Sequence, residues 1–208
     1  MAGAYASAMP IDRRDPAMQG TASRGRCYLY VLPCAYEDLL KLGFSRDPLA
    51  RMQQLHPRWF EFFDLERALL VETESVRDAR TLELSQRRTL VEYNAPMPLT
   101  VREAAGGERE WYRGAYVQIA EAARALGEGG HVLHAPLRDF AREALLARAP
   151  LLFSWSQAML TVDDLDQRIA ATSVQRAVRD ALDAHVALGI DLEPLLPAAV
   201  LRWHREVQ

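Results

Sequence analysis

The stretch that decides the fold is Cys-Tyr-Leu-Tyr-Val-Leu-Pro at residues 27–33, followed after a short connector by Leu-Lys-Leu-Gly-Phe-Ser at residues 40–45. Both runs are rich in apolar, aromatic and β-branched residues, which favour strands. Pro33 ends the first run, and the pair Asp47-Pro48 follows the second. The sequence therefore predicts two antiparallel strands joined as a hairpin.

The two faces of this hairpin differ in chemistry. Side chains alternate along a strand, so Tyr28 and Tyr30 share one face, and the residues between them share the other. In the second run Lys41 and Gly43 likewise alternate with apolar neighbours. One face is thus apolar, and the other offers a phenol and an amine.

Five short motifs occur in a characteristic order. Tyr-Leu-Tyr at 28–30 and Lys-Leu-Gly at 41–43 resemble the paired motifs of the GIY-YIG nuclease superfamily, in the branch whose second motif begins with Lys. Arg51, Glu83 and the closing Glu-Trp-Tyr at 110–112 follow at the spacing of that family. The resemblance covers about half of the chain, from Cys27 to Arg113.

The resemblance implies an α+β fold in which helices flank a three-stranded antiparallel sheet. We expect this GIY-YIG-like domain at residues 26–127, because the Gly-rich sequence after it indicates a boundary. Residues 1–25 mix small and charged residues without periodicity, which predicts a disordered leader. Residues 131–208 form an all-helical accessory region, with helical spacing at 137–148, 162–171 and 174–188.

Two helices of the predicted domain have clear start signals. Asp47-Pro48 provides an N-cap followed by proline at the first helical position, and the helix should run to about His56. Ser75 begins a second helix that should end near Tyr93. A third strand is expected in the second half of residues 59–72, which are rich in aromatic and β-forming types.

Glu83 lies near the middle of the apolar face of the second helix. A carboxylate directed at a core is costly unless it is paired or binds a metal. One interpretation is a structural salt bridge to an arginine such as Arg51. The resemblance implies the other, that Glu83 is the ligand of a single Mg²⁺ or Mn²⁺ ion, which suits one carboxylate supplemented by substrate oxygens and water.

The resemblance also assigns the remaining roles. Tyr30 would position or deprotonate the attacking water, with its pKa lowered by a cation such as Lys41 or Arg51. Lys41 could relay the proton or neutralise phosphate charge, and Arg51 would bind phosphate oxygens two at a time. We expect the remaining substrate contacts from a set of four residues. They are Tyr28, Gly43, Ser45 and His56.

Lys41 has a distinctive place in the composition. The chain has 25 lysine and arginine residues, and Lys41 is its only lysine. Codon bias explains the preference for arginine. One interpretation of the exception is that this position requires an amine, because a lysine can lose its proton and an arginine effectively cannot.

Composition excludes several other classes. The chain has 208 residues, half of them hydrophobic, and a net charge of −3. It lacks an apolar run of the roughly 20 residues that span a bilayer, and it has no secretory pattern, so we expect a cytoplasmic protein without membrane contact. Two cysteines fit a reducing compartment. Because the net charge is slightly negative, nucleic acid must be bound by a local basic patch.

These observations predict a metal-dependent endonuclease that acts on nucleic acid, DNA more than RNA. The alternative is a non-cleaving module that keeps the fold and binds nucleic acid or protein. A cleft in which Tyr30, Lys41, Arg51 and Glu83 meet would favour the enzyme, and a Glu83 sealed in a salt bridge would favour the module. The C-terminal helices would serve target selection, dimerisation or contact with a protein partner.

Overall fold

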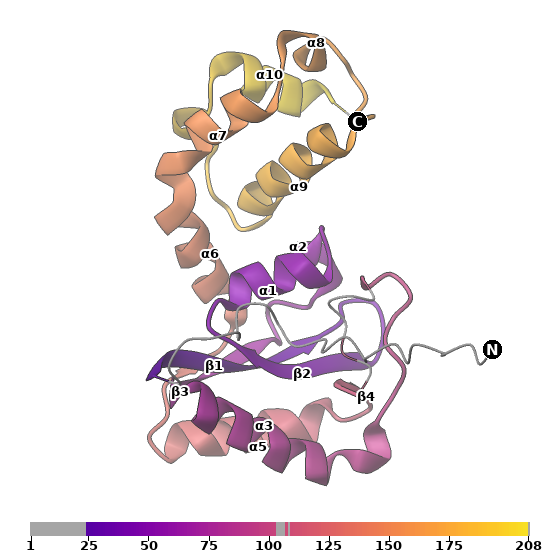
Figure 1. Cartoon of the computed structure of the whole chain (residues 1–208), viewed down its shortest axis with the longest axis vertical. Coiled ribbons are helices and arrows are strands. Elements are labelled where there is room, and N and C mark those ends of the chain that lie inside the picture. Colours follow the sequence, from indigo (N-terminus) through magenta and orange to yellow (C-terminus); the bar gives the residue numbers. More distant parts are fainter. Residues whose placement is uncertain (1–23, 103–106, 108, 208) are drawn as a thin grey trace, which may run out of the picture.

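The computed structural model describes residues 24–102, 107 and 109–207. Its centre is an antiparallel sheet of five strands in the order β4-β2-β1-β3-β5, shown in Figure 1. The expectation of three strands is wrong because two short edge strands, of three and two residues, extend the sheet. Such short strands show no alternation along the sequence. The strands are β1 (Arg24–Pro33), β2 (Leu39–Ser45), β3 (Leu69–Ser75), β4 (Trp111–Arg113) and β5 (Leu133–His134).

The predicted hairpin is confirmed as β1 and β2. These strands pair antiparallel with Tyr30 opposite Gly43 and Leu32 opposite Lys41. Strand β1 begins at Arg24, so the last two residues of the expected leader belong to the sheet. The rest of that leader, residues 1–23, lies outside the described residues.

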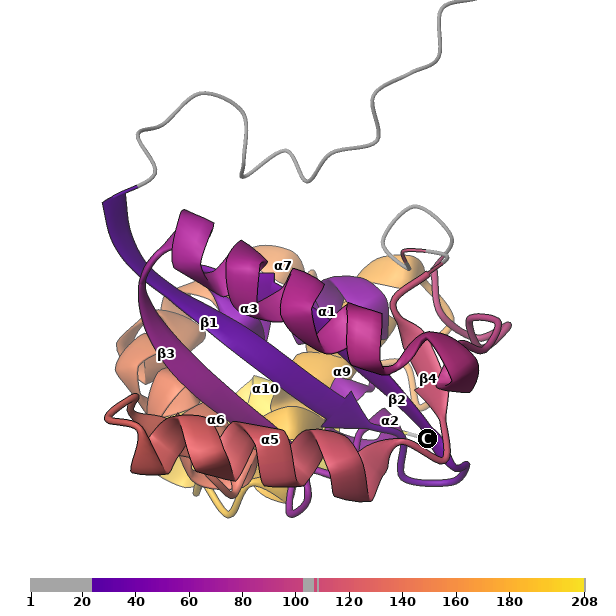
Figure 2. The same ribbon diagram turned by 90° about the horizontal axis from the view of Figure 1, so that it is seen from below.

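Helices cover both faces of the sheet. Figure 1 shows α1 and α2 on one face and α3 and α5 on the other, and Figure 2 shows β1 and β3 between α3 and α5 when that face is seen from below. The cap at Asp47 is confirmed, since its carboxylate accepts a hydrogen bond from Ala50 N. Ser75 caps α3 in the same way. The elements are α1 (Pro48–Leu55), α2 (Trp59–Phe62), α3 (Val76–Thr89), the 3₁₀ turn η2 (Val91–Tyr93) and α5 (Tyr116–Glu128).

Each face of the sheet has its own core. Tyr28, Tyr30 and Leu32 pack with α1 in one hydrophobic cluster. Leu29 and Val31, which alternate with them, pack in a second cluster with residues of α3 and α5. The alternation predicted for the hairpin is therefore confirmed, but both faces are buried.

The expectation of an all-helical region over residues 131–208 is wrong at its start, where β5 joins the sheet by pairing with the edge of β3. The rest of this region is helical and builds a third cluster around Trp203. Helix α9 begins after a capping box between Thr172 and Gln175, and the helix expected over 162–171 ends at Leu165. None of the described helices is long and apolar enough to cross a membrane. The elements are α6 (Leu137–Arg148), η3 (Ala149–Leu151), α7 (Leu152–Met159), α8 (Val162–Leu165), α9 (Ser173–Ala187), η4 (Glu193–Leu195) and α10 (Ala198–Glu206).

The helical part is joined to the sheet through packing and charge. Strand β5 pairs with β3 beyond the predicted boundary, and α6 contributes Leu137 to the cluster under α1. Arg58, which precedes α2, donates hydrogen bonds to Asp180 at 2.9 Å and to Asp183 at 2.7 Å, both on α9. Contacts between the two parts are therefore specific, although the boundary near residue 130 itself stays a prediction.

Candidate active site

Tyr30 lies in the middle of β1, and only 2% of it is exposed. Its partner across the hairpin is Gly43, where an added Cβ would lie 2.4 Å from the Tyr30 hydroxyl oxygen. A contact that short does not occur, so any larger residue would displace the ring. The structure thus explains Gly43 by the space it leaves for the phenol.

The Tyr30 hydroxyl faces Arg51 on α1. The Arg51 Nε donates to the Tyr30 oxygen at 3.5 Å, a long hydrogen bond. Burial raises the pKa of Tyr30 to about 12, and the opposing influence of Arg51 is smaller. Arg51 thus acts to lower this pKa, as expected, but the cost of ionising a buried phenol is larger and the net shift is upward.

Lys41 on β2 is completely buried. Its ammonium donates to Glu110 Oε2 at 2.8 Å and lies 5.2 Å from the centre of the Trp111 ring. Burial lowers the pKa of Lys41, whereas Glu110 and, more weakly, Glu83 raise it. The structure therefore places the chain's only lysine inside the protein, in an ion pair with Glu110.

Glu83 lies on α3 with 4% of its surface exposed, as its position on the apolar face predicts. Its ion-pair partner is Arg87, one turn later, at 3.3 Å, rather than Arg51 as one interpretation expected. Burial raises the pKa of Glu83, and the charge of Glu110 adds to this effect. Arg87 and Lys41 act in the opposite direction.

The four predicted catalytic groups share one electrostatic neighbourhood. The charge of Glu83 influences the pKa of both Tyr30 and Lys41, and so does the charge of Arg51. Tyr30, Lys41 and Glu83 are buried, whereas Arg51 is partly exposed. The buried groups come from the consecutive strands β1 and β2 and from the later helix α3, and α1 supplies the more accessible cation.

Sequence reasoning missed two members of this neighbourhood. Glu110 precedes β4 and binds Lys41, and Arg87 binds Glu83. Arg87 could have been found, because residues four apart on a helix are neighbours and opposite charges pair there. Glu110 was noted as part of a motif, but its partner depends on how β4 pairs with β2, which no local signal reveals.

Each of the four residues expected to contact substrate also makes contacts within the protein. Gly43 accommodates the Tyr30 ring. Tyr28 packs edge-on against Phe140 of α6, with ring centres 5.3 Å apart. The Ser45 hydroxyl bonds both to the backbone nitrogen and to the carbonyl of Asp47. His56 ends α1, stacks on a phenylalanine and has its pKa lowered by burial. Their roles in substrate binding stay predictions.

The donors present suit a weakly held hard cation. Glu83 supplies one buried carboxylate, and Glu110 lies close enough to raise its pKa. No group of three His, Cys, Asp or Glu residues suited to a metal ion occurs in the part of the chain that the structure describes. A site with Glu83 as its main protein ligand would suit Mg²⁺, which is often held by one or two carboxylates and completes its shell with water and phosphate oxygens. It would not suit a metal ion whose ligands must all come from the protein.

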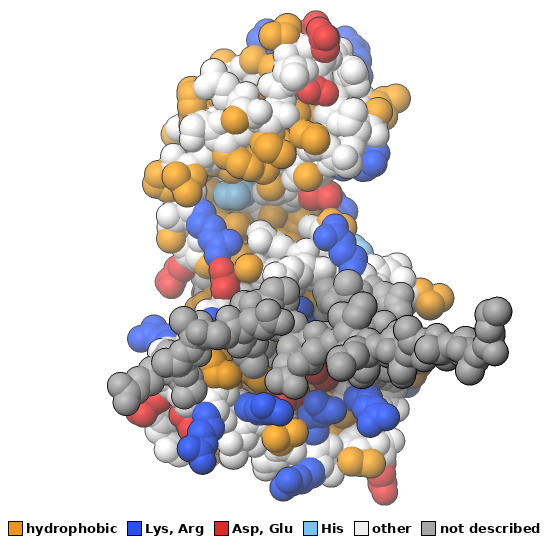
Figure 3. Space-filling view, in the orientation of Figure 1, with side chains coloured by type: hydrophobic (Ala, Val, Ile, Leu, Met, Phe, Trp, Pro, Cys, Tyr) orange, Lys and Arg blue, Asp and Glu red, His pale blue; other side chains and the backbone are white. Residues whose placement is uncertain are grey.

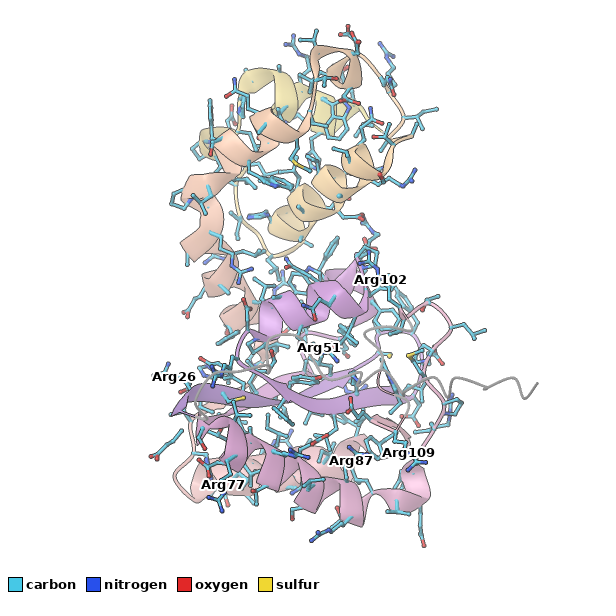
Figure 4. The ribbon with its side chains drawn as sticks, viewed as in Figure 1. Arg26, Arg51, Arg77, Arg87, Arg102 and Arg109 are labelled. Carbon is cyan, nitrogen blue, oxygen red and sulfur yellow. The ribbon has the colours of Figure 1, made fainter. Side chains whose placement is uncertain are left out.

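Arginines surround this neighbourhood. Figure 4 shows Arg51 and Arg102 on the α1 side of the sheet and Arg77, Arg87 and Arg109 on the α3 side. Figure 3 shows basic side chains gathered over the lower part of the same view. On α3 itself the sequence has four arginines and two acidic residues, so this helix is locally basic although the chain is not.

Comparison with known proteins gives one match. No curated protein and no solved structure matches the chain. The model of one family, described as the T5orf172 domain, matches residues 27–127, just under half of the chain. That range contains the hairpin, α3 and β4, and so every residue of the candidate site. Residues 27–127 are therefore similar to a GIY-YIG-like nuclease family, whose domains are nuclease-like and bind nucleic acid.

Proposed function

We propose that residues 26–127 form a GIY-YIG-like endonuclease that hydrolyses phosphodiester bonds of nucleic acid, DNA in preference to RNA, with Mg²⁺ or Mn²⁺. The observation that supports this most is the burial of Lys41 and Glu83 in one electrostatic neighbourhood with Tyr30. Burying charged groups costs free energy, and such clusters are common at functional sites. The family match to a nuclease-like domain supports the same conclusion.

Phosphodiester hydrolysis requires positive charge where the transition state gathers negative charge. Two cations lie in this neighbourhood: Arg51 donates a hydrogen bond to the Tyr30 hydroxyl, and Lys41 donates one to Glu110. We assign Arg51 to two oxygens of the scissile phosphate, because a guanidinium binds them in pairs. Lys41, which is buried on β2, would supply further positive charge beneath the phosphate.

Glu83 is assigned to the metal ion, with Glu110 as the neighbouring carboxylate. A bound divalent cation would act as a Lewis acid that stabilises the departing 3′ oxygen. The raised pKa of Glu83 agrees with this role, because a buried carboxylate with little compensation gains most from a nearby cation. In the absence of a metal ion, Arg87 is the residue that neutralises Glu83.

Tyr30 is assigned to positioning the attacking water as a neutral phenol. With a pKa of about 12 it is protonated at neutral pH and can donate as well as accept a hydrogen bond. Its ring packs over Gly43 and its hydroxyl accepts a hydrogen bond from Arg51, so the fold holds the hydroxyl in one orientation. Orienting a nucleophile in this way lowers the barrier without any change in protonation.

The arginines of α3 are assigned to the phosphate backbone on either side of the cut. Arg77, Arg80 and Arg88 are exposed, and Arg87 is partly exposed. Each phosphate contact that releases a counterion adds to the salt dependence of binding. This local patch supports nucleic-acid binding by a chain whose net charge is −3.

A second candidate is a module that binds nucleic acid without cutting it. The ion pair between Glu83 and Arg87 favours it, since it neutralises the carboxylate that would hold the metal. The two candidates differ in one measurable respect: both bind nucleic acid, but only the enzyme depends on Glu83 for cleavage.

The experiment is Mg²⁺-dependent cleavage of plasmid and of single-stranded DNA and RNA by the wild type, Glu83→Ala and Glu121→Ala. Glu121 is an exposed residue of α5 and serves as the matched control. We expect Glu83→Ala to lose at least about 100-fold in rate, as for removal of a key electrostatic group, and Glu121→Ala to match the wild type. Equal cleavage by the wild type and Glu83→Ala would overturn the proposal.

A further inference from the structure

Glu110 is fixed to β2 by its backbone and its side chain. Its carbonyl accepts from the backbone nitrogen of Leu42 at 3.0 Å, and its carboxylate accepts from Lys41 at 2.8 Å. The next residue, Trp111, pairs with Lys41 in the strand register. The carboxylate is thus held against the ammonium by the same pairing that builds the sheet edge.

The connector before β4 leaves room for this carboxylate. An added Cβ at Gly107 would lie 2.4 Å from Glu110 Oε2, and the backbone φ of +63° at this glycine is one that other residues rarely adopt. A larger residue at this position would therefore push Glu110 away from Lys41.

We propose that Glu110 is a positioning residue of the nuclease site, whose carboxylate holds the buried Lys41 ammonium in a fixed place beneath the phosphate. The contact between the two groups is a geometric fact of the fold, and its catalytic consequence rests on the proposed function. An ammonium fixed before substrate arrives stabilises developing charge without any cost of reorganisation.

The charges around Lys41 explain why such a partner is needed. Burial and Arg51 of α1 both lower the pKa of Lys41, so each favours loss of its proton. Glu110 is the largest influence that raises the pKa, and Glu83 of α3 contributes less. Tyr30, on the neighbouring strand β1, is protonated at neutral pH and so adds no charge. Glu110 is therefore the group that most favours the charged form of Lys41.

The composition makes this directly measurable. Because Lys41 is the only lysine of the chain, protein grown with ¹³C-labelled lysine gives a single lysine Cε resonance. We would follow that resonance against pH in the wild type and in Glu110→Gln, which keeps the shape and a hydrogen-bond acceptor but removes the charge. Glu121→Gln on α5 is the matched control.

We expect the titration of Lys41 to move to lower pH in Glu110→Gln and to stay unchanged in Glu121→Gln. Circular dichroism would establish that both variants are folded. If Glu110→Gln is folded and Lys41 titrates as in the wild type, the proposal is overturned.

Cleavage supplies the second readout. If Lys41 must be charged, the alkaline limb of the pH profile of Glu110→Gln moves to lower pH with the resonance, and kcat falls more than KM rises. We expect a loss of about tenfold or more at alkaline pH that shrinks as the pH is lowered. A uniform loss at every pH indicates a structural role and contradicts the proposal. A moved resonance in a protein whose wild type does not cleave would refute the proposed function but keep the Glu110–Lys41 coupling.

Discussion

The sheet and the C-terminal helices bury different kinds of polar residue. In the sheet and α3 the buried polar side chains include the charged groups Lys41 and Glu83. In the helices they are Ser156, Gln175 and His185. Ser156 and His185 each bond to a backbone carbonyl within their own helix, and the Gln175 side chain accepts from the backbone nitrogen of Thr172 at the N-cap of α9. The second kind satisfies local backbone groups at little cost. The first kind is costly, and that cost is the reason for which we propose a catalytic role for this part of the chain.

The largest effect is expected from replacing the buried amine. Lys41→Met fills a similar volume without charge, and Glu110, which is 28% exposed, can turn to water. We expect the variant to stay folded and to lose at least about 100-fold in cleavage. The paired variant His185→Leu in the helices should cleave as the wild type does, since the Nε2 of His185 has no hydrogen-bond partner in the described structure.

These two variants are compared by circular dichroism and by the rate of plasmid cleavage. The contrast between the regions would be lost if Lys41→Met kept most of its activity. It would also be lost if His185→Leu reduced activity as strongly.

The next effect concerns the space that Gly43 leaves. Gly43→Ala should destabilise the fold by about 1–3 kcal/mol, because the new methyl group overlaps the Tyr30 hydroxyl. Removing the ring in Tyr30→Ala should relieve the overlap, so the alanine at 43 should cost less in that background. Urea unfolding of the two single variants and the double variant measures this coupling. Purely additive costs would show that the ring and the glycine do not depend on each other.

Arg58 tests how the two regions are joined. Its hydrogen bonds to Asp180 and Asp183 connect α2 to α9, so Arg58→Ala should cost about 1–3 kcal/mol in the free energy of unfolding. Arg179→Ala, whose ion pair with Asp183 spans 3.8 Å, should cost less. Cleavage by both should match the wild type. A larger cost for Arg179→Ala would contradict the account.

This junction also predicts a dependence on acid. Burial acts to raise the pKa of Asp183, but hydrogen bonds from Arg58 and His204 outweigh it and hold the pKa below its ordinary value. The stabilisation is therefore present above the ordinary pKa and is lost as the pH falls through the lowered one. The difference in stability between wild type and Arg58→Ala should shrink in that acidic range, as urea unfolding at several pH values would show.

The smallest effect is expected on stability from Glu83→Gln. Because burial raises the pKa of Glu83, its ionised form costs stability as the pH rises above the ordinary value for a carboxyl. Glu83→Gln removes that charge, so its melting temperature should exceed that of the wild type at pH 8 and equal it near pH 4. A variant that is less stable at pH 8 would show that the ion pair with Arg87 outweighs the cost of burial.

Local signals explain what the sequence predicted correctly. Alternation identified the hairpin, and Asp47 and Ser75 marked the helix starts, because each depends on neighbours within a few residues. The 3.6-residue period placed Glu83 on a buried face. The same reasoning missed Arg87, although the four-residue spacing was visible.

Non-local packing explains what it did not predict. The short strands β4 and β5 form only because longer strands present free edges to them. Tyr28 meets Phe140 across more than a hundred residues, and the burial that raises the pKa of Tyr30 depends on α1 covering the sheet. Partners for the C-terminal helices, including a second copy of the chain, stay a prediction.

The most direct test of the central claim is single-turnover cleavage of a labelled DNA duplex, with the metal chelated and then restored. We predict that the wild type cuts only when Mg²⁺ is restored, and that Glu83→Gln, folded and able to bind the duplex, cuts at least about 100-fold more slowly. Cleavage that survives chelation, or that proceeds equally in Glu83→Gln, would contradict the assignment of the buried charges to a metal-dependent nuclease site.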